Sequence, residues 1–449
     1  MKKQFILALL LSTQTLLMSD YTISAGKRSI SKIDHMPKGK IADMYSIPQD
    51  PRYYAKQFKP VSYKEQLKWD REYNQKYFHP WYINRIDKPL NEMEWAFRAV
   101  TKKTIYDKRG VVIPSSIYNN WIRNSNFDRL NSVNLKGITI RHTDVHALPT
   151  SRSFYHDPKK VGEGFPFDYN QNSSYYMNTP LYISHYSLDK RWVFVRGSTA
   201  YGWIKVSDVA IVDSKFIKQF RNHNYAIAVK DDLKLKNGKK YISIIKLGTI
   251  FPMIKSGKGK KTTRYLFATK GKRSKAILQS ATALNKNYII KKPIAMTANN
   301  VAKIAKEFYN EPYGWGGLLQ TRDCSSFTKD YFSPFGIFLR RNSSKQARDG
   351  EYCNIRGIPK NKKKRAIITN AKPFRSMLYV PGHIVLYLGH YKGEPVIMHT
   401  YWGARLKDGS KKILGRTVIT TTEPGRELKN IKESSKLANT LKAIITPGE

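Results

Sequence analysis

Cysteine is scarce in this chain, whose 449 residues include only Cys324 and Cys353. So few cysteines exclude a scaffold built on disulfides, and no cysteine and histidine cluster has the spacing of a structural zinc site. We therefore expect no metal and no other cofactor. A disulfide between the two cysteines would consume a candidate nucleophile, so we expect two free thiols, with Cys353 taking no part in chemistry.

Acidic residues are also few, 33 against 80 lysines and arginines, which gives a formal net charge of +47. A charge of this sign favours polyanionic partners. Nucleic acid is the usual polyanion, but the chain has no recognisable RNA- or DNA-binding motif and begins like an exported protein. We therefore expect anionic envelope polymers as partners and no nucleic acid; a compositional bias toward lysine is the alternative. The basic run 360–365 is predicted to be a solvated surface loop.

Long apolar runs are absent beyond the N-terminus, so no membrane-spanning helix is expected in the mature chain. Met1-Lys-Lys3 followed by the apolar run Phe5–Leu11 is typical of a secretory signal peptide, and Ile23-Ser-Ala25 supplies a cleavage region. An uncleaved membrane anchor is the alternative, although the apolar run is short and interrupted. No cysteine follows closely, which argues against a lipid anchor. Residues 1–25 therefore predict export to the periplasm or cell envelope of a bacterium.

The sequence around Cys324 suits a nucleophilic thiol. Glycines at 314, 316 and 317 permit a tight turn shortly before it, and residues 325–332 carry apolar side chains at helical spacing. A helix that begins near Cys324 directs unpaired N–H groups toward the sulfur. We therefore expect a lowered thiol pKa and an oxyanion hole formed by the same N–H groups.

Two histidines supply the remaining parts of a thiol-hydrolase site. A nucleophilic cysteine needs a base within hydrogen-bond reach, and that base needs a third group to fix its tautomer. His383 opens an apolar run, 384–388, that reads as a buried strand, and His399 lies in a second predicted strand, 395–400. A hairpin would bring the two together. We predict Cys324 as nucleophile, His383 as base and His399 as orienting group, with His390 as the alternative for that last role.

Four motifs in the same order resemble the NlpC/P60 family of cell-wall cysteine peptidases. They are Tyr-x-Trp-Gly-Gly at 313–317, Asp-Cys-Ser at 323–325, Arg-x-Ser-x-x-Gln within 339–346, and Gly-His-Ile-Val-Leu-Tyr-Leu-Gly at 382–389. The family's usual Asp-Cys-Ser-Gly reads Asp-Cys-Ser-Ser in this chain, and the two histidines are separated by a somewhat long hairpin. The resemblance implies an α+β fold with a papain-like catalytic domain.

The resemblance also implies a function: an endopeptidase that cuts peptidoglycan stem peptides between γ-D-glutamate and a diamino acid such as diaminopimelate. Tyr313 then supports the oxyanion. Candidates for holding the stem, each with a purely structural role as the alternative, are Asp323, Ser325, Trp315, Asn342 and Ser343. An N-acetylmuramoyl-L-alanine amidase with the same chemistry and a non-catalytic wall-binding protein are the alternative functions. Stem peptides or muropeptides are the expected partners of a monomer.

The middle of the chain predicts two small β-barrels. Short strands separated by turns run from 126 to 290, and the stretch Arg191–Val206 resembles bacterial SH3-like domains. We predict a first SH3-like domain over 126–215 and a second over 216–290. The predicted strands of the first are Gly137–Arg141, Leu181–His185, Trp192–Arg196, Gly202–Val206 and Val209–Val212, and those of the second are Tyr225–Val229, Tyr241–Ile245, Thr249–Ile254 and Tyr265–Thr269.

The remaining segments flank these barrels. Residues 27–125 resemble the helical N-terminal stabilising region of some NlpC/P60 enzymes, with a polar, flexible lead up to residue 45. Predicted helices in this region are Ser62–Phe78, with Ser62 and Glu65 forming a capping box, and Asn91–Val100. The catalytic domain is predicted over 291–430, starting with a helix that Thr297 caps. Residues 431–449 are predicted to be a polar tail with a short helix, Lys432–Leu441.

Overall fold

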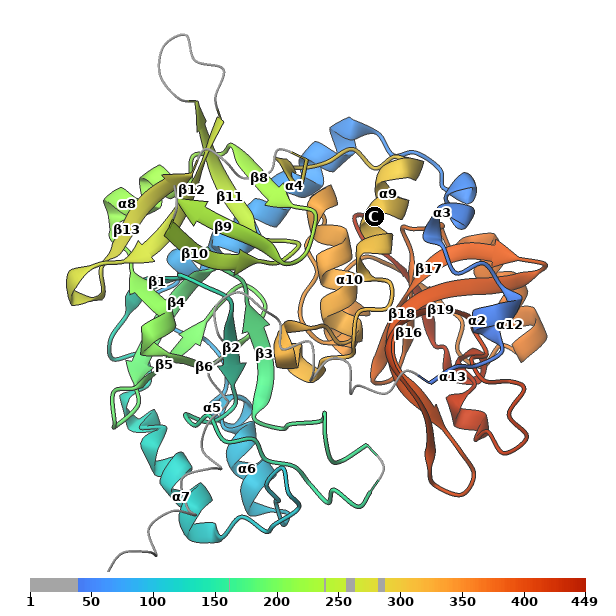
Figure 1. Ribbon diagram of the computed structural model, residues 1–449, viewed down its shortest axis with the longest axis horizontal. Helices are drawn as coiled ribbons and strands as arrows, with labels where there is room; N and C mark the ends of the chain where they lie inside the picture. The colour runs from blue at the N-terminus through green and yellow to red at the C-terminus, as the bar shows by residue number, and fades with distance from the viewer. Residues whose placement is uncertain (1–38, 161, 238–239, 256–262, 282–286) are drawn as a thin grey trace, which may run out of the picture. The chain divides into compact units, whose positions relative to one another are not determined.

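The computed structural model describes residues 39–160, 162–237, 240–255, 263–281 and 287–449 (Figure 1). The predicted signal peptide, 1–25, lies outside these residues. In the described part of the chain, no helix is both long enough and apolar enough to cross a membrane.

The N-terminal region is helical, as predicted. Its longest helix, α4 (Tyr63–Phe78), begins directly after Ser62, but the Ser62 side chain makes no capping hydrogen bond, so the predicted capping box is wrong. Burial of an aromatic face stabilises this helix instead, because Trp69, Tyr77 and Phe78 join the main core. The predicted helix 91–100 is two short helices. The shorter helices are α2 (Asp43–Ser46), α3 (Pro51–Tyr54), α5 (Leu90–Met93), α6 (Trp95–Thr101) and α7 (Ser115–Asn124).

The end of the predicted flexible lead is docked rather than free. The Asp43 carboxylate in α2 is buried and accepts hydrogen bonds from the backbone N–H and the hydroxyl of Thr421, at 2.8 and 3.0 Å. Ile41 packs on Leu414 and Val418 in the same apolar cluster. The prediction of a flexible lead is therefore wrong for residues 39–45, because one apolar side chain and one buried carboxylate anchor them.

The first β-rich unit forms a seven-stranded sheet in the order β3-β2-β6-β5-β4-β1-β7. Every predicted strand in it is present. The polar strands β2 and β3 are not among the predicted ones. In β3, Gln171 and Ser173 are buried, and the Gln171 side chain bonds Asp144 in β2 and the carbonyl of Gly316, contacts that a hydrophobic pattern does not reveal. The strands are β1 (Leu135–Thr139), β2 (Thr143–His146), β3 (Gln171–Tyr175), β4 (Pro180–Tyr186), β5 (Trp192–Arg196), β6 (Tyr201–Lys205) and β7 (Val209–Ile211).

The next segment opens with α8 (Ser214–Phe220) and forms a five-stranded sheet, β13-β12-β11-β8-β14, beside the two-stranded sheet β10-β9. The four predicted strands are present. That these strands form a second SH3-like barrel stays a prediction. The strands are β8 (Tyr225–Ala228), β9 (Leu233–Asn237), β10 (Lys240–Ile245), β11 (Ile250–Lys255), β12 (Thr263–Lys270), β13 (Ala276–Ala281) and β14 (Ile289–Lys291).

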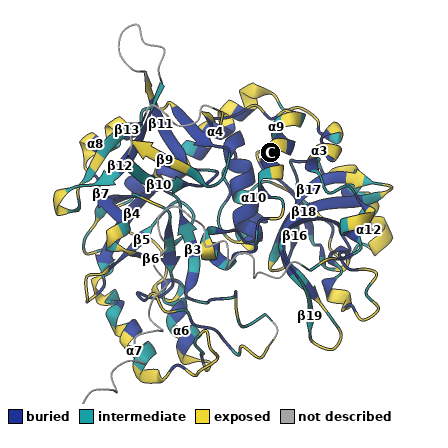
Figure 2. Cartoon of the chain, in the orientation of Figure 1, coloured by how far each residue is buried: buried dark blue, intermediate teal, exposed yellow. Residues whose placement is uncertain are grey.

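The C-terminal part combines helices with a six-stranded sheet in the order β15-β20-β16-β17-β18-β19. Helix α9 (Ala298–Phe308) is capped by Thr297, as predicted. Figure 2 shows that α10 and the central strands are largely buried. The other elements are α10 (Cys324–Phe332), α11 (Ser343–Gln346), α12 (Lys360–Asn370), α13 (Leu437–Thr440), β15 (Glu351–Asn354), β16 (Met377–Val380), β17 (His383–Tyr391), β18 (Glu394–Arg405), β19 (Lys411–Thr421) and β20 (Ala443–Thr446).

Two segments of this part differ from the predictions. The segment 431–449 is not merely a polar tail: its strand β20 is buried and pairs with β15 on one side and β16 on the other. The four apolar and small residues of β20 were too short a run to stand out in a polar context. The basic run 360–365 is not a loop but the start of α12, where Lys363 and Ile367 face the interior.

Candidate active site

Cys324 is the first residue of α10, at the position the sequence predicts. Asp323 caps the helix: its carboxylate accepts from the backbone N–H groups of Ser325 and Ser326, while the Ser326 hydroxyl accepts from the Asp323 N–H. The thiol residue itself is 9% exposed. The reciprocal cap therefore fixes the backbone on both sides of a nearly buried sulfur.

The pKa of the thiol moves opposite to the expected direction. Burial raises the pKa of Cys324 to about 12, and the neighbouring Asp323 charge adds to this effect. Hydrogen bonds from the backbone N–H groups of Ile384 and Ser325, together with the Arg341 charge, lower it by less. The predicted lowering by the helix N-terminus is wrong for this resting state, because desolvation of a thiolate outweighs the N–H groups. The resting thiol is neutral.

His383 and His399 meet across the β17–β18 hairpin, as predicted. Nε2 of His383 lies 2.9 Å from Nδ1 of His399, and the rings are 5.2 Å apart. The opposite nitrogen of His399, Nε2, lies 3.1 Å from the hydroxyl of Thr420 on β19. Three neighbouring strands thus place a His-His-Thr chain of polar contacts in the sheet.

The direction of these hydrogen bonds follows from Thr420. Its hydroxyl donates its single proton to the carbonyl of Thr421 at 2.7 Å, so it accepts from Nε2–H of His399. Burial, reinforced by the neighbouring His383, holds the pKa of His399 well below its ordinary value, so His399 is neutral and its Nδ1 accepts from His383. Burial also lowers the pKa of His383 to about 4. A neutral His383 that donates from Nε2 keeps a free lone pair on Nδ1.

The thiol of Cys324 lies beside the histidine pair without a hydrogen bond to it. The amide of Ile384, the residue after His383, bonds the thiol of Cys324. In the described part of the chain, no hydrogen bond links the sulfur to either histidine, a looseness common in ligand-free sites. His390 lies at the other end of β17, where it is exposed and its backbone bonds the Gln57 side chain. The structure therefore does not bring His390 to His383.

Arg341 begins the Arg-x-Ser-x-x-Gln motif and is not among the predicted site residues, yet it lies beside the thiol. Its guanidinium bonds the carboxylate of Asp323 and the hydroxyl of Ser325. Burial acts to raise the pKa of Asp323, but the charge and hydrogen bonds of Arg341 outweigh it and keep that pKa below its ordinary value. A buried ion pair therefore lies beside Cys324, and Ser325 connects its two members.

The glycine-rich turn before Cys324 accommodates a strand of the first β-rich unit. Gly316 has φ +60°, and a Cβ on it would lie 2.2 Å from the carbonyl oxygen of Gln171 in β3. Gly317 has φ +93°, and a Cβ on it would lie 2.4 Å from the hydroxyl oxygen of Ser174. The Gln171 side chain also donates to the Gly316 carbonyl at 3.2 Å. The predicted tight turn is confirmed, and close approach of β3 is the physical reason for glycine.

Aromatic side chains continue this contact around the site. The ring of Phe167, from the loop before β3, lies 5.3 Å from that of Trp315 and 5.6 Å from that of Trp402 on β18. Tyr313 is buried and its ring contacts both Phe167 and Trp402. Burial, with added effects of the Asp323 and Cys324 charges, raises the pKa of Tyr313 well above its ordinary value, so its phenol keeps a proton to donate.

Asn342 and Ser343, the remaining predicted site residues, belong to the start of α11. Asn342 caps α11 by accepting from the backbone N–H of Ser344 at 2.9 Å, and Ser343 is buried at the start of that helix. Cys353 lies in β15, at an edge of the six-stranded sheet and packed against a different apolar cluster from Cys324. Both cysteines are free thiols, as predicted.

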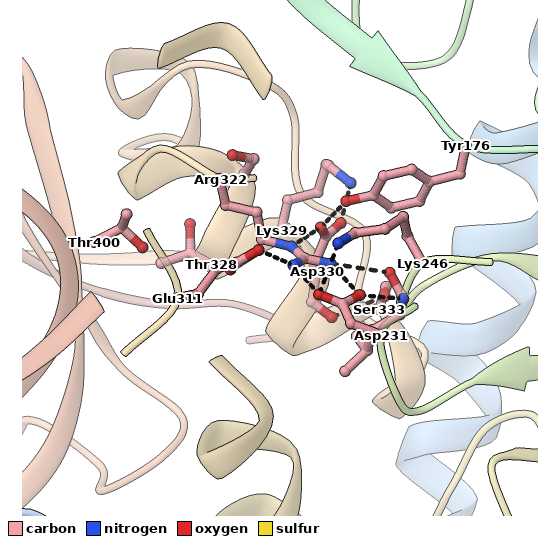
Figure 3. A network of polar contacts seen from close by, with 12 residues as sticks. Tyr176, Asp231, Lys246, Glu311, Arg322, Thr328, Lys329, Asp330, Ser333 and Thr400 are labelled. Atoms are coloured by element: carbon pink, nitrogen blue, oxygen red, sulfur yellow. Dashed lines mark hydrogen bonds and ion pairs between the residues drawn. The ribbon is translucent and has the colours of Figure 1, made fainter. Parts of the chain in front are cut away.

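A buried network of charges includes Asp330 of α10 and Arg322, which precedes the helix (Figure 3). Arg322, 1% exposed, pairs with Asp231, Glu311 and Asp330 at 2.6, 2.8 and 2.5 Å. Burial acts to raise the pKa of Asp231, but the charges of Arg322 and Lys246 outweigh it and lower that pKa. Tyr176, from the first β-rich unit, donates to Asp330 as well. Three parts of the chain thus converge on the residue two places before Cys324.

No group of three or more His, Cys, Asp or Glu side chains among the described residues is arranged to hold a metal ion.

The sequence matches three known domain families. Residues 310–412 match the NlpC/P60 family, residues 153–205 match an SH3 domain of the SH3b1 type, and residues 9–130 match the N-terminal NlpC/P60 stabilising domain. No curated protein sequence matches the chain.

A solved structure shares the fold. An NlpC/P60 endopeptidase from Photobacterium damselae subsp. piscicida aligns with a TM-score of 0.79 at 23% identity, covering 92% of this chain and 98% of that one. An NlpC/P60 family protein from Bacillus cereus aligns with a TM-score of 0.44 at 13% identity, covering 70% of this chain and 100% of that one.

The chain therefore contains an NlpC/P60 domain, a domain of cysteine hydrolases, preceded by a stabilising domain and an SH3b-type domain. The predicted α+β fold class is confirmed. The SH3 match falls within the predicted first barrel, 126–215, and none of the three family matches covers the predicted second barrel, 216–290.

Proposed function

We propose that this protein is a cysteine endopeptidase that hydrolyses peptidoglycan stem peptides at the bond between γ-D-glutamate and a diamino acid. The observation that carries the proposal is the histidine pair beside Cys324, because His399 and Thr420 leave Nδ1 of His383 as the free lone pair. That arrangement is the one a thiol hydrolase requires of its base. The NlpC/P60 domain and its SH3b neighbour support a cell-wall substrate.

In the proposed mechanism Cys324 and His383 are both neutral until the substrate binds. Nδ1 of His383 takes the thiol proton as Cys324 attacks the γ-carbonyl carbon, so a stable thiolate is not needed beforehand. N–H groups at the start of α10, with the Tyr313 phenol, bond the oxyanion. His383 then gives its proton to the departing amine and later activates water to release the acyl-enzyme.

The stem peptide is proposed to lie along the face shared with the first SH3 domain. Asp323 and Ser325, oriented by Arg341, and the wall of Trp315 are proposed to hold the half of the stem that becomes the acyl-enzyme. Ser343 and Asn342 are proposed to contribute through the position of α11. Such a substrate lies outside the cytoplasm, so we also propose export, with residues 1–25 as signal peptide, and a monomeric enzyme.

Product analysis tests the reaction. Pure protein is incubated separately with muropeptides and with free stem peptides, and the products are identified by mass spectrometry. Release of L-Ala-γ-D-Glu with the complementary diamino-acid fragment supports the proposal. Release of an intact stem from the sugar indicates the amidase alternative. Binding to the wall without any hydrolysis would contradict both and leave the wall-binding alternative.

The three histidines are expected to differ in their contribution to kcat/KM. His383→Ala removes the group that handles every proton transfer and should cost about 10²–10⁴-fold. His399→Ala removes only the orienting group and should cost about 10–100-fold. His390→Ala, at the exposed end of β17, should leave kcat/KM nearly unchanged. A large loss for His390→Ala with a small one for His399→Ala would transfer the orienting role to His390.

The first SH3 domain is expected to restrict which stems enter. Close contacts of β3 with Gly316 and of Phe167 with Trp315 bring this domain to the site's edge. We expect the full protein to cleave a free L-Ala-γ-D-Glu-diaminopimelate tripeptide and to leave the same stem attached to muramic acid uncut. Rates on the two substrates are compared by chromatography. Equal rates would show that the domain does not close the cleft.

A further inference from the structure

The N-terminal segment 39–49, which we call the strap, lies along the outer edge of the six-stranded sheet. Strand β19 is the last in the order β15-β20-β16-β17-β18-β19, so no further strand covers its outer edge among the described residues. Helix α2 of the strap lies against β19 (Figure 1). A Cβ on Gly39, at the start of the strap, would lie 1.8 Å from the carbonyl oxygen of Ile413, so the two backbones are in close contact.

The strap binds both neighbours of Thr420, the residue whose hydroxyl orients the histidine pair. On one side, the side-chain amide of Gln49 donates to the carbonyl of Ile419 at 3.2 Å. On the other side, the carboxylate of Asp43, 1% exposed, accepts from the N–H and the hydroxyl of Thr421 at 2.8 and 3.0 Å. The carbonyl of Thr421 in turn receives the hydroxyl proton of Thr420. Asp43 and Gln49 therefore fix the direction in which the Thr420 hydroxyl points.

A second connection runs from the strap to the histidines through Tyr401. Ile41 of the strap is 3% exposed and belongs to the same apolar cluster as Tyr401. The ring of Tyr401 stacks on His399, with centroids 4.7 Å apart and an interplanar angle of 19°, and lies 5.6 Å from His383. The strap therefore supports both neighbours of the His399 ring, the hydroxyl that accepts its proton and the ring that stacks on it.

Asp43 is a costly way to anchor a chain segment. Its Oδ1 is buried and has no hydrogen-bond partner among the described residues. Burial also raises the pKa of Asp43, against the opposing hydrogen bonds from Thr421. An apolar side chain would hold the strap in place without burying a polar oxygen. What the carboxylate adds is the fixed position of Thr421.

We infer that the strap positions the catalytic histidines, with Asp43 and Gln49 as positioning residues that act through Thr420. This inference rests on the proposed function, in which His399 orients the base. When the Thr420 hydroxyl is displaced, His399 loses the acceptor that keeps its proton on Nε2, and the proton can move to Nδ1. Nδ1 then no longer accepts from His383, whose free lone pair is no longer directed to the thiol. The reaction thus depends on a carboxylate 378 residues before Thr421.

Kinetics of the full-length protein on the free tripeptide L-Ala-γ-D-Glu-diaminopimelate test the inference. Asp43→Ala removes the acceptor of Thr421 and should lower kcat about tenfold, as expected for a group that orients a catalytic histidine. KM should change by less than about twofold, because the strap orients the base and does not hold the substrate. Asp43→Asn keeps an oxygen that accepts both hydrogen bonds and should stay within about twofold of the wild type. Gln49→Ala loses one hydrogen bond and should lower kcat about threefold.

A double-mutant cycle separates positioning from general stability. Thr420→Val removes the hydroxyl itself, so adding Asp43→Ala to it should lower kcat little further. Losses that multiply overturn the inference, and so does an unchanged kcat in Asp43→Ala. If thermal unfolding shows that Asp43→Ala does not fold, the same cycle with Gln49→Ala decides. The control Asp213→Ala removes a carboxylate that accepts from the backbone N–H of Phe216 at 2.8 Å, and should leave kcat unchanged.

Alkylation of Cys324 by iodoacetamide separates this inference from the proposed function. His383 accepts the thiol proton in this reaction as well, so the rate near neutral pH reports on the histidine pair without any peptide. In a Cys353→Ser background, Asp43→Ala should slow alkylation about tenfold, and Asp43→Asn should hardly change it. Equal rates in Asp43→Ala and its parent overturn the inference and leave the proposed function standing. A wild type that cleaves no stem peptide overturns the proposed function, and the alkylation rates still decide whether the strap positions the histidines.

Discussion

Replacing Cys324 with serine is expected to reduce kcat/KM on the free tripeptide by about 10⁴-fold or more. A serine hydroxyl is a far weaker nucleophile than a thiol that passes its proton to His383. The fold should be retained, because the cap of α10 is made by Asp323 and Ser326 and not by the thiol. The two quantities to measure are the rate of tripeptide cleavage and the midpoint of thermal unfolding.

Cys353→Ser is the matched control for this variant. Cys353 is a free thiol in edge strand β15, partly exposed and away from the histidine pair. Its replacement should leave the rate nearly unchanged. If Cys353→Ser abolished cleavage and Cys324→Ser did not, the assignment of the nucleophile would be wrong.

Replacing Arg322 with methionine is expected to cause the largest loss of stability of any single substitution considered for this protein. Arg322 is 1% exposed and pairs with Asp231, Glu311 and Asp330 (Figure 3). Removing one partner of a buried ion pair costs about 3–5 kcal/mol, because the remaining charges stay buried without compensation. The midpoint of thermal unfolding should fall by roughly 5 °C or more. Activity should fall with it, because Arg322 is two residues from Cys324.

Arg52→Met provides the comparison for a surface pair. Arg52 bonds Asp50 at 2.5 Å, but its side chain is 68% exposed, so solvent screens the interaction. Its replacement should leave the unfolding midpoint almost unchanged. Equal shifts for the two variants would contradict the view that the Arg322 network carries a large share of the stability around the thiol.

Local pattern accounts for the elements that were predicted correctly. The apolar spacing after Cys324 predicts α10, and the apolar runs after His383 and before His399 predict the hairpin that unites them. The helix and the hairpin can be predicted because each depends on the spacing of apolar residues that are close together in the sequence. Local pattern does not predict β20, because its four residues form an internal strand only when β15 and β16 lie on either side of it.

The chemistry of the site depended on contacts between distant segments. Nothing in the sequence marks Thr420, yet its hydroxyl determines which nitrogen of His399 carries the proton. The helix N-terminus predicts a lowered thiol pKa, but burial raises the pKa of Cys324 to about 12. Asp231 reaches Arg322 across 91 residues of sequence. Desolvation depends on everything packed around a group, which no local pattern contains.

The sequence by itself determined the order of the domains, the identity of the candidate nucleophile and the hairpin that carries the two histidines, because each is encoded in short motifs and periodicities. The tertiary structure alone decided the protonation states of the thiol and the histidines and the buried charge network around Arg322. Each of these arises where burial removes water from charges contributed by separate segments, and the energy of a charge is set by its three-dimensional surroundings.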